Sequence, residues 1–259
     1  MTVLSVNVNK IAWLRNARGG DRPSVVDCAR TILDAGAAGI TVHPRPDARH
    51  IRADDVYALK EALNEYPGRE FNIEGNPTAP ARDNGYPGFD HLVEAVQPDQ
   101  CTLVPDDDAQ LTSDHGWNLA HPNTVTQLQE RVGRYQSWGA RVSLFMDPVH
   151  AHIATAKRLG ADRIELYTGP YADLVTERGL DHPESNRSWR TYRDAARYAN
   201  ECGLGVNAGH DLDLVNLARF VSIEGIAEVS IGHALIADAL ESGLAPTVKQ
   251  YLQELELEP

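Results

Sequence analysis

Short apolar segments alternate with segments of helical spacing along the whole chain of 259 residues, and this alternation restricts the folds that the chain can adopt. The apolar segments have the length and the β-branched content of strands buried in a parallel sheet. The eight predicted strands cover residues 4–9, 39–42, 70–75, 100–104, 140–146, 162–168, 204–208 and 228–231. Because no linker interrupts the alternation, the sequence predicts one α/β domain over residues 1–259, a (β/α)8 TIM barrel with extra helices.

An open, doubly wound sheet is the alternative architecture for such an alternation. The first predicted strand is not followed by a glycine-rich phosphate loop, and this absence counts against the open sheet. The predicted helices cover residues 25–35, 53–64, 89–96, 125–138, 152–159, 189–202, 213–221, 234–240 and 248–255. Residues 11–20, 106–123 and 169–187 are predicted loops, and the loop after the fourth strand is long enough to serve as a lid.

Cationic and imidazole side chains follow the second predicted strand. His43 and Arg45 come directly after the apolar run 39–42, and His50 follows shortly afterwards. Prolines 44 and 46 remove backbone donors that a continuing strand would need, so the strand ends at His43. In parallel α/β proteins the active site lies at the carboxyl ends of the strands, which makes this segment a candidate site rather than a solvated basic loop.

Polar residues stand at most of the other predicted strand exits. Each one alone is explained by a capped strand end, but a barrel brings all the exits to one mouth. A carboxylate together with imidazoles and cations suits proton transfer next to a carbonyl group. The residues at these exits are Asn7, Asn9, Lys10, Glu74, Asp147, Thr168, Asn207, His210, Gly232 and His233.

Two groups of these residues have the character of anion sites. The exits of strands seven and eight, with His210, Gly232 and His233, match the usual phosphate site of a barrel. Arg18, Arg45 and His50 form a second candidate group. The Asp211 carboxylate would repel a phosphate group at this site. Its alternative role is to cap the helix that follows. Two anion sites predict two phosphorylated substrates, or one bisphosphate.

Composition excludes several classes of partner. The formal net charge of −13 argues against nucleic acid and anionic membranes. Neither a signal peptide nor a membrane-length apolar run is found, and three scattered cysteines indicate reduced thiols, so we expect a cytoplasmic protein. His150 and His152 are an isolated pair at the start of a helix, and we expect no metal.

The strand exits also resemble a known family. The resemblance rests on VNVNKIAWLRNARG at 6–19, on GITVHPR at 39–45, and on shorter blocks at 49–51, 72–74, 103–105, 142–145, 165–169, 206–210 and 231–234. In this order, these blocks resemble the pyridoxine 5′-phosphate synthases. The resemblance implies condensation of 1-deoxy-D-xylulose 5-phosphate with 3-amino-2-oxopropyl phosphate to pyridoxine 5′-phosphate, phosphate and water. It also implies a homo-oligomer, an octamer, and no cofactor.

The resemblance further implies roles for individual residues. His43 and Glu74 would accept protons, and His210 would donate one. Arg45, His50 and Thr112 would hold the deoxyxylulose phosphate. Asn7, Arg18, Gly232 and His233 would hold the amino-ketone phosphate, with Asp211 beside them. Asn9 and Lys10, in the same corner, are further candidate substrate-binding residues.

The chain departs from the family pattern at two places. It has Asn9-Lys10 where the pattern has Asp-His, and Asp211 where the pattern has Gly. Lys10 leaves open a second enzyme class, a Schiff-base aldolase acting on a sugar phosphate. A non-catalytic sensor of phosphorylated metabolites is a third alternative.

Overall fold

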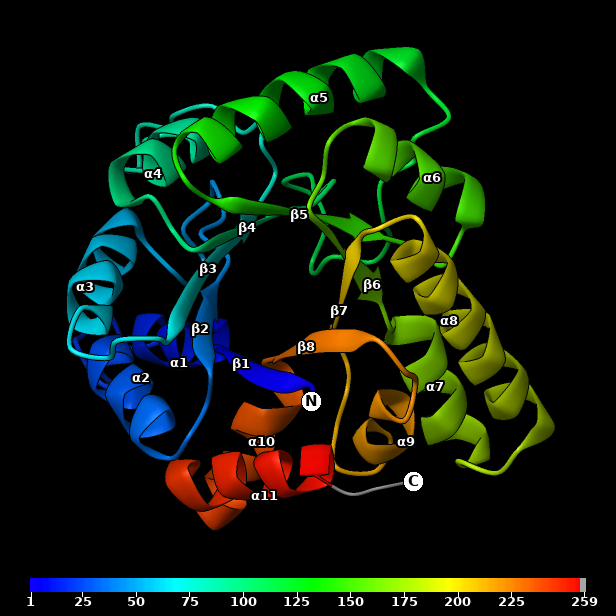
Figure 1. Cartoon of the computed structure of the whole chain (residues 1–259). Coiled ribbons are helices and arrows are strands. Elements are labelled where there is room, and N and C mark those ends of the chain that lie inside the picture. The colour runs from blue at the N-terminus through cyan, green and yellow to red at the C-terminus, as the bar shows by residue number, and fades with distance from the viewer. Residues whose placement is uncertain (257–259) are drawn as a thin grey trace.

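The computed structural model describes residues 1–256 and contains a closed barrel of eight parallel strands, each hydrogen-bonded to the next in sequence order (Figure 1). The last strand pairs with the first, so that Leu4 lies opposite Val229. The strands are β1 (Val3–Asn7), β2 (Gly39–Val42), β3 (Glu70–Gly75), β4 (Gln100–Leu103), β5 (Arg141–Met146), β6 (Arg163–Tyr167), β7 (Gly205–Gly209) and β8 (Ile226–Ile231). The predicted TIM barrel is confirmed, and the open sheet is excluded.

The two faces of the barrel wall differ in polarity. Apolar residues such as Phe71 and Ile73 of β3 are fully buried in the hydrophobic core. Polar side chains alternate with them and meet inside the barrel, since Gln100 of β4 donates a 3.2 Å hydrogen bond to Glu228 of the non-neighbouring β8. A barrel usually fills its interior with branched apolar residues. Here hydrogen bonds satisfy much of the interior.

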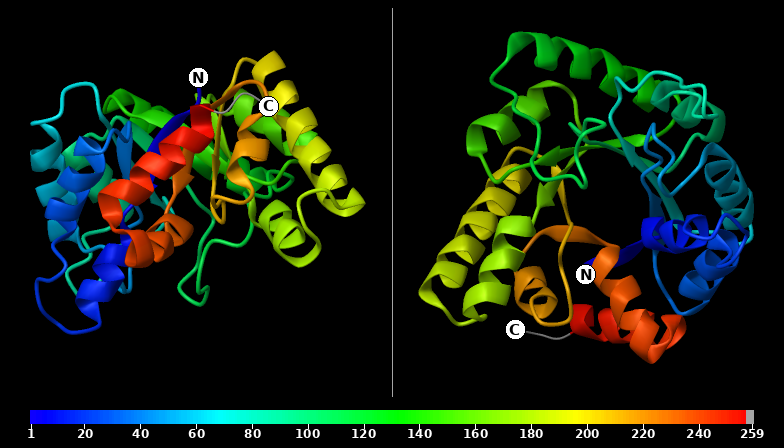
Figure 2. Two further views of the ribbon diagram at one scale, coloured as in Figure 1. Left: turned by 90° about the horizontal axis from the view of Figure 1, so that it is seen from below. Right: turned by 180° about the vertical axis from the view of Figure 1, so that it is seen from behind.

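Helices surround the barrel in every view (Figures 1 and 2). They are α1 (Asn9–Asn16), α2 (Val25–Asp34), α3 (Ala53–Leu63), α4 (Phe89–Val96), α5 (Pro122–Ser137), α6 (His150–Arg158), α7 (Gly169–Arg178), α8 (Pro183–Glu201), α9 (Leu217–Val221), α10 (His233–Ser242) and α11 (Leu244–Glu256). The last helix, α11, packs against α2, α9 and α10. It thereby brings an early helix and the late helices of the chain together on one side of the barrel. None of these helices, within residues 1–256, has both the length and the apolar character needed to cross a bilayer.

The prediction of a loop at 11–20 was wrong, because residues 9–16 form α1. The predicted first strand therefore ends at Asn7 rather than Asn9. The Asn7 side chain accepts a 3.0 Å hydrogen bond from the Asn9 backbone N–H and turns the chain into the helix. Ile11, Ala12 and Arg15 form the buried face of α1. This short amphipathic pattern was obscured by exposed aromatic and aliphatic residues between them.

The prediction of a loop at 169–187 was also wrong. Residues 169–178 form α7, and α8 begins at Pro183, before the predicted start at 189. Both helices carry a proline in their first turn, where its missing N–H costs no intrahelical hydrogen bond. The predicted helix at 213–221 begins only at Leu217, because Asp213 accepts hydrogen bonds from two following backbone N–H groups and forms a turn.

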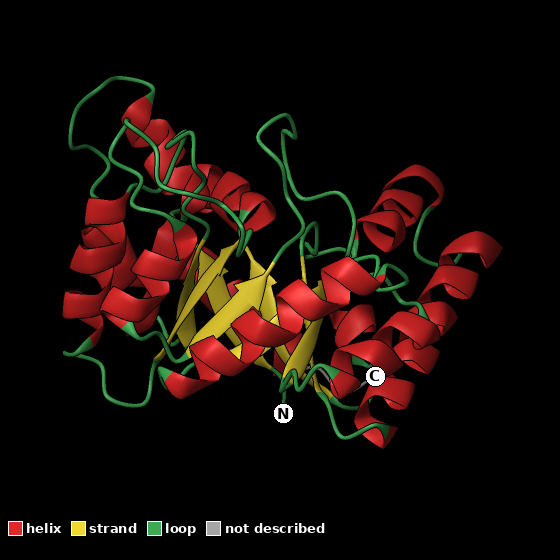
Figure 3. Cartoon of the chain, turned by 90° about the horizontal axis from the view of Figure 1, so that it is seen from above, coloured by secondary structure: helices red, strands yellow, loops and turns green. Residues whose placement is uncertain are grey.

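The longer loops rise beyond the end of the barrel that lies opposite the N-terminus (Figure 3). One of them runs from Val104 to His121 between β4 and α5 and overlaps the loop predicted at residues 106–123; we refer to it as the lid, a role that stays a prediction. Trp117 fixes its far end, since its backbone N–H donates to Phe145 and its indole N–H donates to Leu103, at 2.9 and 2.8 Å. This arrangement leaves the nearer part of the loop above the barrel mouth.

Candidate active site

A cavity of about 550 Å³ opens at the barrel mouth where the strand exits converge. Of the strand-exit residues expected at the mouth, Asp147, Thr168 and Asn207 do not line the cavity, but all the expected catalytic and substrate-binding residues except Arg18 do. They are Asn7, Asn9, Lys10, His43, Arg45, His50, Glu74, Thr112, His210, Asp211, Gly232 and His233. The cavity also contains residues that the sequence reasoning did not assign to a site, namely Trp13, Val104, Leu111, Ser113, Phe145, Glu165 and Ser230.

Arg18 lies outside this cavity, in the exposed turn after α1. The other arginine of that segment, Arg15, points away from the mouth and pairs with Asp55 at the start of α3. Arg15 also donates to the backbone carbonyl of His50 at 3.3 Å. Its structural effect is therefore to hold α1, α3 and the loop that carries His50 together.

A chain of amide hydrogen bonds connects three strand exits. The Asn7 side chain donates to Glu74 at 3.3 Å, and the Asn9 side chain accepts from the His43 backbone N–H at 2.9 Å. Asn7 and Asn9 are themselves linked by the hydrogen bond that starts α1. The exits of β1, β2 and β3 are thus fixed relative to one another, which holds Glu74 and His43 in one region of the cavity.

Two buried carboxyl groups face the cavity, Glu74 from β3 and Glu165 from β6. Burial, followed by the charge of Glu165, raises the pKa of Glu74 well above its usual range. Burial, followed by the charge of Glu228, raises the pKa of Glu165 to about 8. Sequence reasoning placed Glu165 inside a strand but gave it no role. The signal was present, because Glu165 alternates with the apolar residues Ile164 and Leu166 and therefore faces the barrel interior.

The two histidines that follow β2 are buried and neutral. Burial, reinforced by Arg45, lowers the pKa of His43 to about 3. Burial, reinforced by His43 and Arg45, lowers the pKa of His50 to about 2. His50 Nδ1 accepts a 2.9 Å hydrogen bond from the Ile51 backbone N–H. In neutral His50 the proton is therefore on Nε2, which makes Nε2 a hydrogen-bond donor.

Arg45 forms a buried ion pair with Asp106 at the start of the lid, and both side chains are at most 6% exposed. Asp106 also accepts a hydrogen bond from the Ser113 hydroxyl at 2.9 Å. His43 Nε2 lies 3.6 Å from the Asp106 carboxylate. The Arg45 guanidinium donates further to the Gln110 carbonyl at 2.8 Å. Through Asp106 and Gln110, these contacts hold the first part of the lid against the residues that follow β2.

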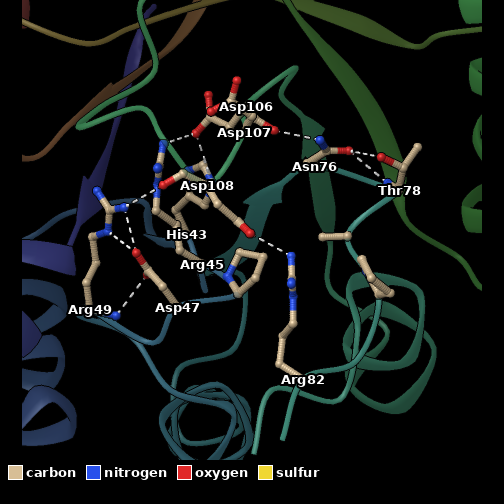
Figure 4. Close-up of a pocket in the computed structure, with 13 residues that line it drawn as sticks. His43, Arg45, Asp47, Arg49, Asn76, Thr78, Arg82, Asp106, Asp107 and Asp108 are labelled. Atoms are coloured by element: carbon tan, nitrogen blue, oxygen red, sulfur yellow. Dashed lines mark hydrogen bonds and ion pairs between the residues drawn. The ribbon is translucent and has the colours of Figure 1, made fainter. Parts of the chain in front are cut away.

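A second, smaller pocket of about 210 Å³ shares His43 and Arg45 with the first as lining residues (Figure 4). Two ion pairs lie along its wall, in which Arg49 contacts Asp47 and Arg82 contacts Asp108. Arg49 also donates to the backbone carbonyl of Leu111 at 3.1 Å. The arginines that line this pocket therefore help to hold the lid in place.

Lys10 lies in the first turn of α1, with its Nζ 4.7 Å from the centre of the Trp13 ring. Partial burial, followed by the charges of Arg45 and Arg49, lowers the pKa of Lys10, while Asp211 acts in the opposite direction. A cation over the face of an aromatic ring is stabilised electrostatically. Lys10 is thus placed in the cavity as the sequence predicted.

His210 and Asp211 follow β7 directly. Both have left-handed backbone conformations, with φ of 77° and 47°. Asp211 therefore adopts a conformation that glycine would adopt easily and that Asp tolerates better than most residues. Gly232, at the exit of β8, is constrained by packing, since an added Cβ would lie 3.0 Å from the Cβ of Asn7.

Within residues 1–256 we find no group of three or more His, Cys, Asp or Glu side chains arranged to hold a metal ion. His150 is exposed on α6 and stacks on Tyr198, with ring centres 4.4 Å apart. Neither His150 nor His152 lines the cavity at the barrel mouth. Metal independence stays a prediction that a chelation experiment must test.

Comparison with known proteins shows the family to which the chain that forms this cavity belongs. The sequence model of the family described as "Pyridoxal phosphate biosynthesis protein PdxJ" matches residues 4–257. The chain belongs to the PdxJ family. A pyridoxine 5′-phosphate synthase of Xanthomonas campestris pv. campestris (strain B100) is 56% identical over 252 residues, which are 97% of this chain and 95% of that protein.

A second PdxJ relative, the pyridoxine 5′-phosphate synthase of Xylella fastidiosa (strain 9a5c), is 52% identical over 256 residues, 98% of this chain and 95% of that protein. The predicted family is thus confirmed, and this member of the PdxJ family is an enzyme. Among solved structures, thiamine phosphate pyrophosphorylase from Pyrococcus furiosus superposes with a TM-score of 0.61 at 12% identity, covering 98% of this chain and 95% of that one. 3-Hexulose-6-phosphate synthase from Salmonella typhimurium superposes with a TM-score of 0.59 at 15% identity, covering 98% and 100%. These likenesses concern the fold alone.

Proposed function

We propose that this enzyme condenses 1-deoxy-D-xylulose 5-phosphate with 3-amino-2-oxopropyl phosphate and forms pyridoxine 5′-phosphate, phosphate and water. The observation that carries the proposal is the cavity itself. It combines a buried carboxyl group, Glu74, with neutral His43 and with the cations Arg45 and Lys10. The relatives named pyridoxine 5′-phosphate synthase support the same activity.

The condensation requires repeated proton transfers at carbons next to carbonyl or imine groups. Neutral His43 has a free lone pair on one ring nitrogen, so it has the protonation state of a proton acceptor, and its lowered pKa makes it a weak base in the absence of substrate. Glu74 and Glu165 share a low-dielectric site, so the first carboxyl to ionise makes ionisation of the second harder. We assign the ionised position to Glu74, the proposed proton acceptor, whose carboxylate the Asn7 amide would stabilise by donating to it, and the protonated position to Glu165.

Two regions of the cavity are suited to phosphate groups. On one side, Arg45 supplies a cation and His50 supplies its Nε2–H donor. On the other side, α10 begins at His233, and the first N–H groups of a helix are not used within it. We assign the deoxyxylulose phosphate to the Arg45 side, with Thr112, and the amino-ketone phosphate to the α10 side, with Asn7, Asn9, Lys10 and Gly232.

We further propose that the enzyme is cytoplasmic and works as a homo-oligomer, an octamer. Cys28, Cys101 and Cys202 are all free thiols, which is typical of a reducing compartment. Trp13 and Leu14 of α1 and Tyr57 of α3 are large apolar side chains that are 36–54% exposed. Such groups are suited to a contact between copies. Arg18, which lies outside the cavity of its own chain, is retained as a proposed substrate ligand only on the strength of the family resemblance.

The decisive experiment mixes the two phosphorylated substrates with protein that has been treated exhaustively with a chelator. We expect pyridoxine 5′-phosphate, identified by absorbance and mass, together with one equivalent of inorganic phosphate. Binding of both substrates without product would instead indicate a metabolite sensor. Activity that is lost on chelation and restored by zinc or manganese would show that the reaction depends on a metal.

Lys10 gives a further prediction, because it could act as a fixed cation or as a Schiff-base nucleophile. We favour the cation, since one substrate already carries the amine that an imine needs. We expect Lys10→Arg to keep partial activity and Lys10→Met to raise the KM of one phosphorylated substrate by about tenfold, as for a lost charge-assisted hydrogen bond.

The lowered pKa of Lys10 is the observation that keeps the aldolase alternative in view, because a nucleophilic lysine must lose its proton. Borohydride added with either substrate separates the two roles. An unchanged protein mass supports the cation. A reduced covalent adduct mapped to Lys10 would establish the aldolase chemistry and contradict our assignment.

A further inference from the structure

The backbone that follows β7 is strained, and side chains donate hydrogen bonds to three of its successive carbonyl groups. The Thr168 hydroxyl contacts the carbonyls of Gly209, at 2.8 Å, and of His210. The Asn216 side chain donates to the carbonyl of Asp211 at 3.3 Å. Two consecutive non-glycine residues with positive φ are rare, and such conformations persist when the surrounding structure enforces them. The conformation therefore places the two side chains in a defined relation.

The consequence is that both nitrogens of the His210 ring have partners. Nδ1 lies 2.5 Å from the Asp211 carboxylate, and Nε2 lies 2.7 Å from the Thr112 hydroxyl of the lid. The edge of the Tyr167 ring supports the imidazole from β6, with ring centres 5.6 Å apart. A carboxylate can only accept a hydrogen bond, so Nδ1 must carry a proton. Nε2 is then the nitrogen that faces the cavity and exchanges a proton there.

We propose that Asp211 is a positioning residue that holds His210 in the Nδ1–H form and directs Nε2 to the cavity. This inference rests on the proposed function, in which His210 is the proton donor. The imidazolium keeps both hydrogen bonds before transfer, and after Nε2 has given up its proton the Nδ1–H bond to Asp211 remains. The ring therefore does not need to turn or to change tautomer during the transfer, which would otherwise slow each step.

The position of Asp211 supports this role over a helix cap. α9 begins six residues later, at Leu217, and the turn before it is capped by Asp213. The Asp211 carboxylate makes no contact with that turn; its partner is His210. Burial opposes its ionisation, but the hydrogen bond and charge of His210, followed by the charges of His233 and Lys10, lower the pKa of Asp211. Asp211 is thus kept ionised at the cavity wall.

The test uses protein labelled with ¹⁵N-histidine, in which the His210 signals are identified by their loss in His210→Gln. At a pH where the ring is neutral, we expect the wild type to show the Nδ1–H tautomer. Asp211→Asn should keep it, because an amide oxygen also accepts a hydrogen bond. Asp211→Gly should lose it, and its kcat should fall about tenfold with KM nearly unchanged, a modest part of the contribution of a general acid.

Two features make the test specific. Glycine adopts the left-handed conformation without strain, so loss of turnover in Asp211→Gly will not arise from unfolding. The matched control is Asp114→Asn, which alters a similar pair with His115 on the exposed outer side of the lid and should change neither the tautomer nor kcat. An unchanged His210 tautomer in Asp211→Gly would overturn the proposal, as would an unchanged kcat. The tautomer is measured without substrates, so it decides the role of Asp211 even if the product assay fails.

Discussion

Replacing Glu74 by glutamine should lower turnover by about a hundredfold or more and leave the binding of both substrates largely intact, as expected for the loss of a general base. Glutamine has the shape of the carboxyl group and can still accept the hydrogen bond from Asn7. It cannot accept a proton from a carbon acid. Steady-state kinetics together with calorimetric binding of each substrate alone would separate the two effects.

We expect Glu74→Gln to be at least as stable as the wild type. Because burial raises the pKa of Glu74, ionising this carboxyl is harder in the folded state than in the unfolded chain, so the wild type loses stability as pH rises above the ordinary carboxyl pKa. Glutamine removes that cost, so the thermal midpoint at pH 8 should equal or exceed that of the wild type. Glu70→Gln is the matched control, since Glu70 stands on the same strand but pairs with Arg141 at the other end of the barrel. Turnover close to that of the wild type in Glu74→Gln would refute the assigned role.

Arg45→Met should raise the KM of deoxyxylulose phosphate by about a hundredfold, because two charge-assisted hydrogen bonds to a phosphate contribute about 3 kcal/mol. The same change should lower the free energy of unfolding by about 3 kcal/mol, because it leaves Asp106 buried without its partner. Kinetics with each substrate varied in turn, and denaturant unfolding, would measure the two effects separately.

A double variant distinguishes the binding role of Arg45 from its structural role. Arg45→Met with Asp106→Leu replaces the buried pair by apolar groups and should recover most of the lost stability, but not the affinity for phosphate. Arg82→Met is the control, since Arg82 forms an exposed pair with Asp108 of the same lid outside the larger cavity. Such exposed pairs contribute little to stability. Recovery of KM in the double variant would show that Arg45 acts on the lid and not on the substrate.

The barrel and most of its mouth were predictable because the relevant signals are local. A parallel strand buried on both faces is a short apolar run, and the residue that ends it is read directly from the sequence, as for Val42 and His43. The convergence of the exits then follows from the barrel itself. This is why the positions of Glu74, His43 and His210 could be predicted without any knowledge of tertiary contacts.

Contacts between distant segments could not be predicted in this way. Arg15 and Arg18 look alike in sequence, and only the partner of Arg15, Asp55, 40 positions away, shows which of them is structural. Asp106 was read as a lid residue because nothing in its neighbourhood indicates that it is buried against Arg45. The helix that starts at Gly169 was missed, although its proline lies in the first turn, where a helix tolerates proline.

The pairing of β1 with β8 has a consequence for the synthesis of the protein. These strands lie at opposite ends of the sequence, so β1 presents an unpaired edge until the last strand has emerged from the ribosome. Asn7 comes from β1 and Gly232 from the exit of β8, and the two are in contact in the finished barrel. The cavity is therefore complete only when β8 has joined β1, and a truncated chain that lacks β8 would have neither a closed barrel nor an assembled site.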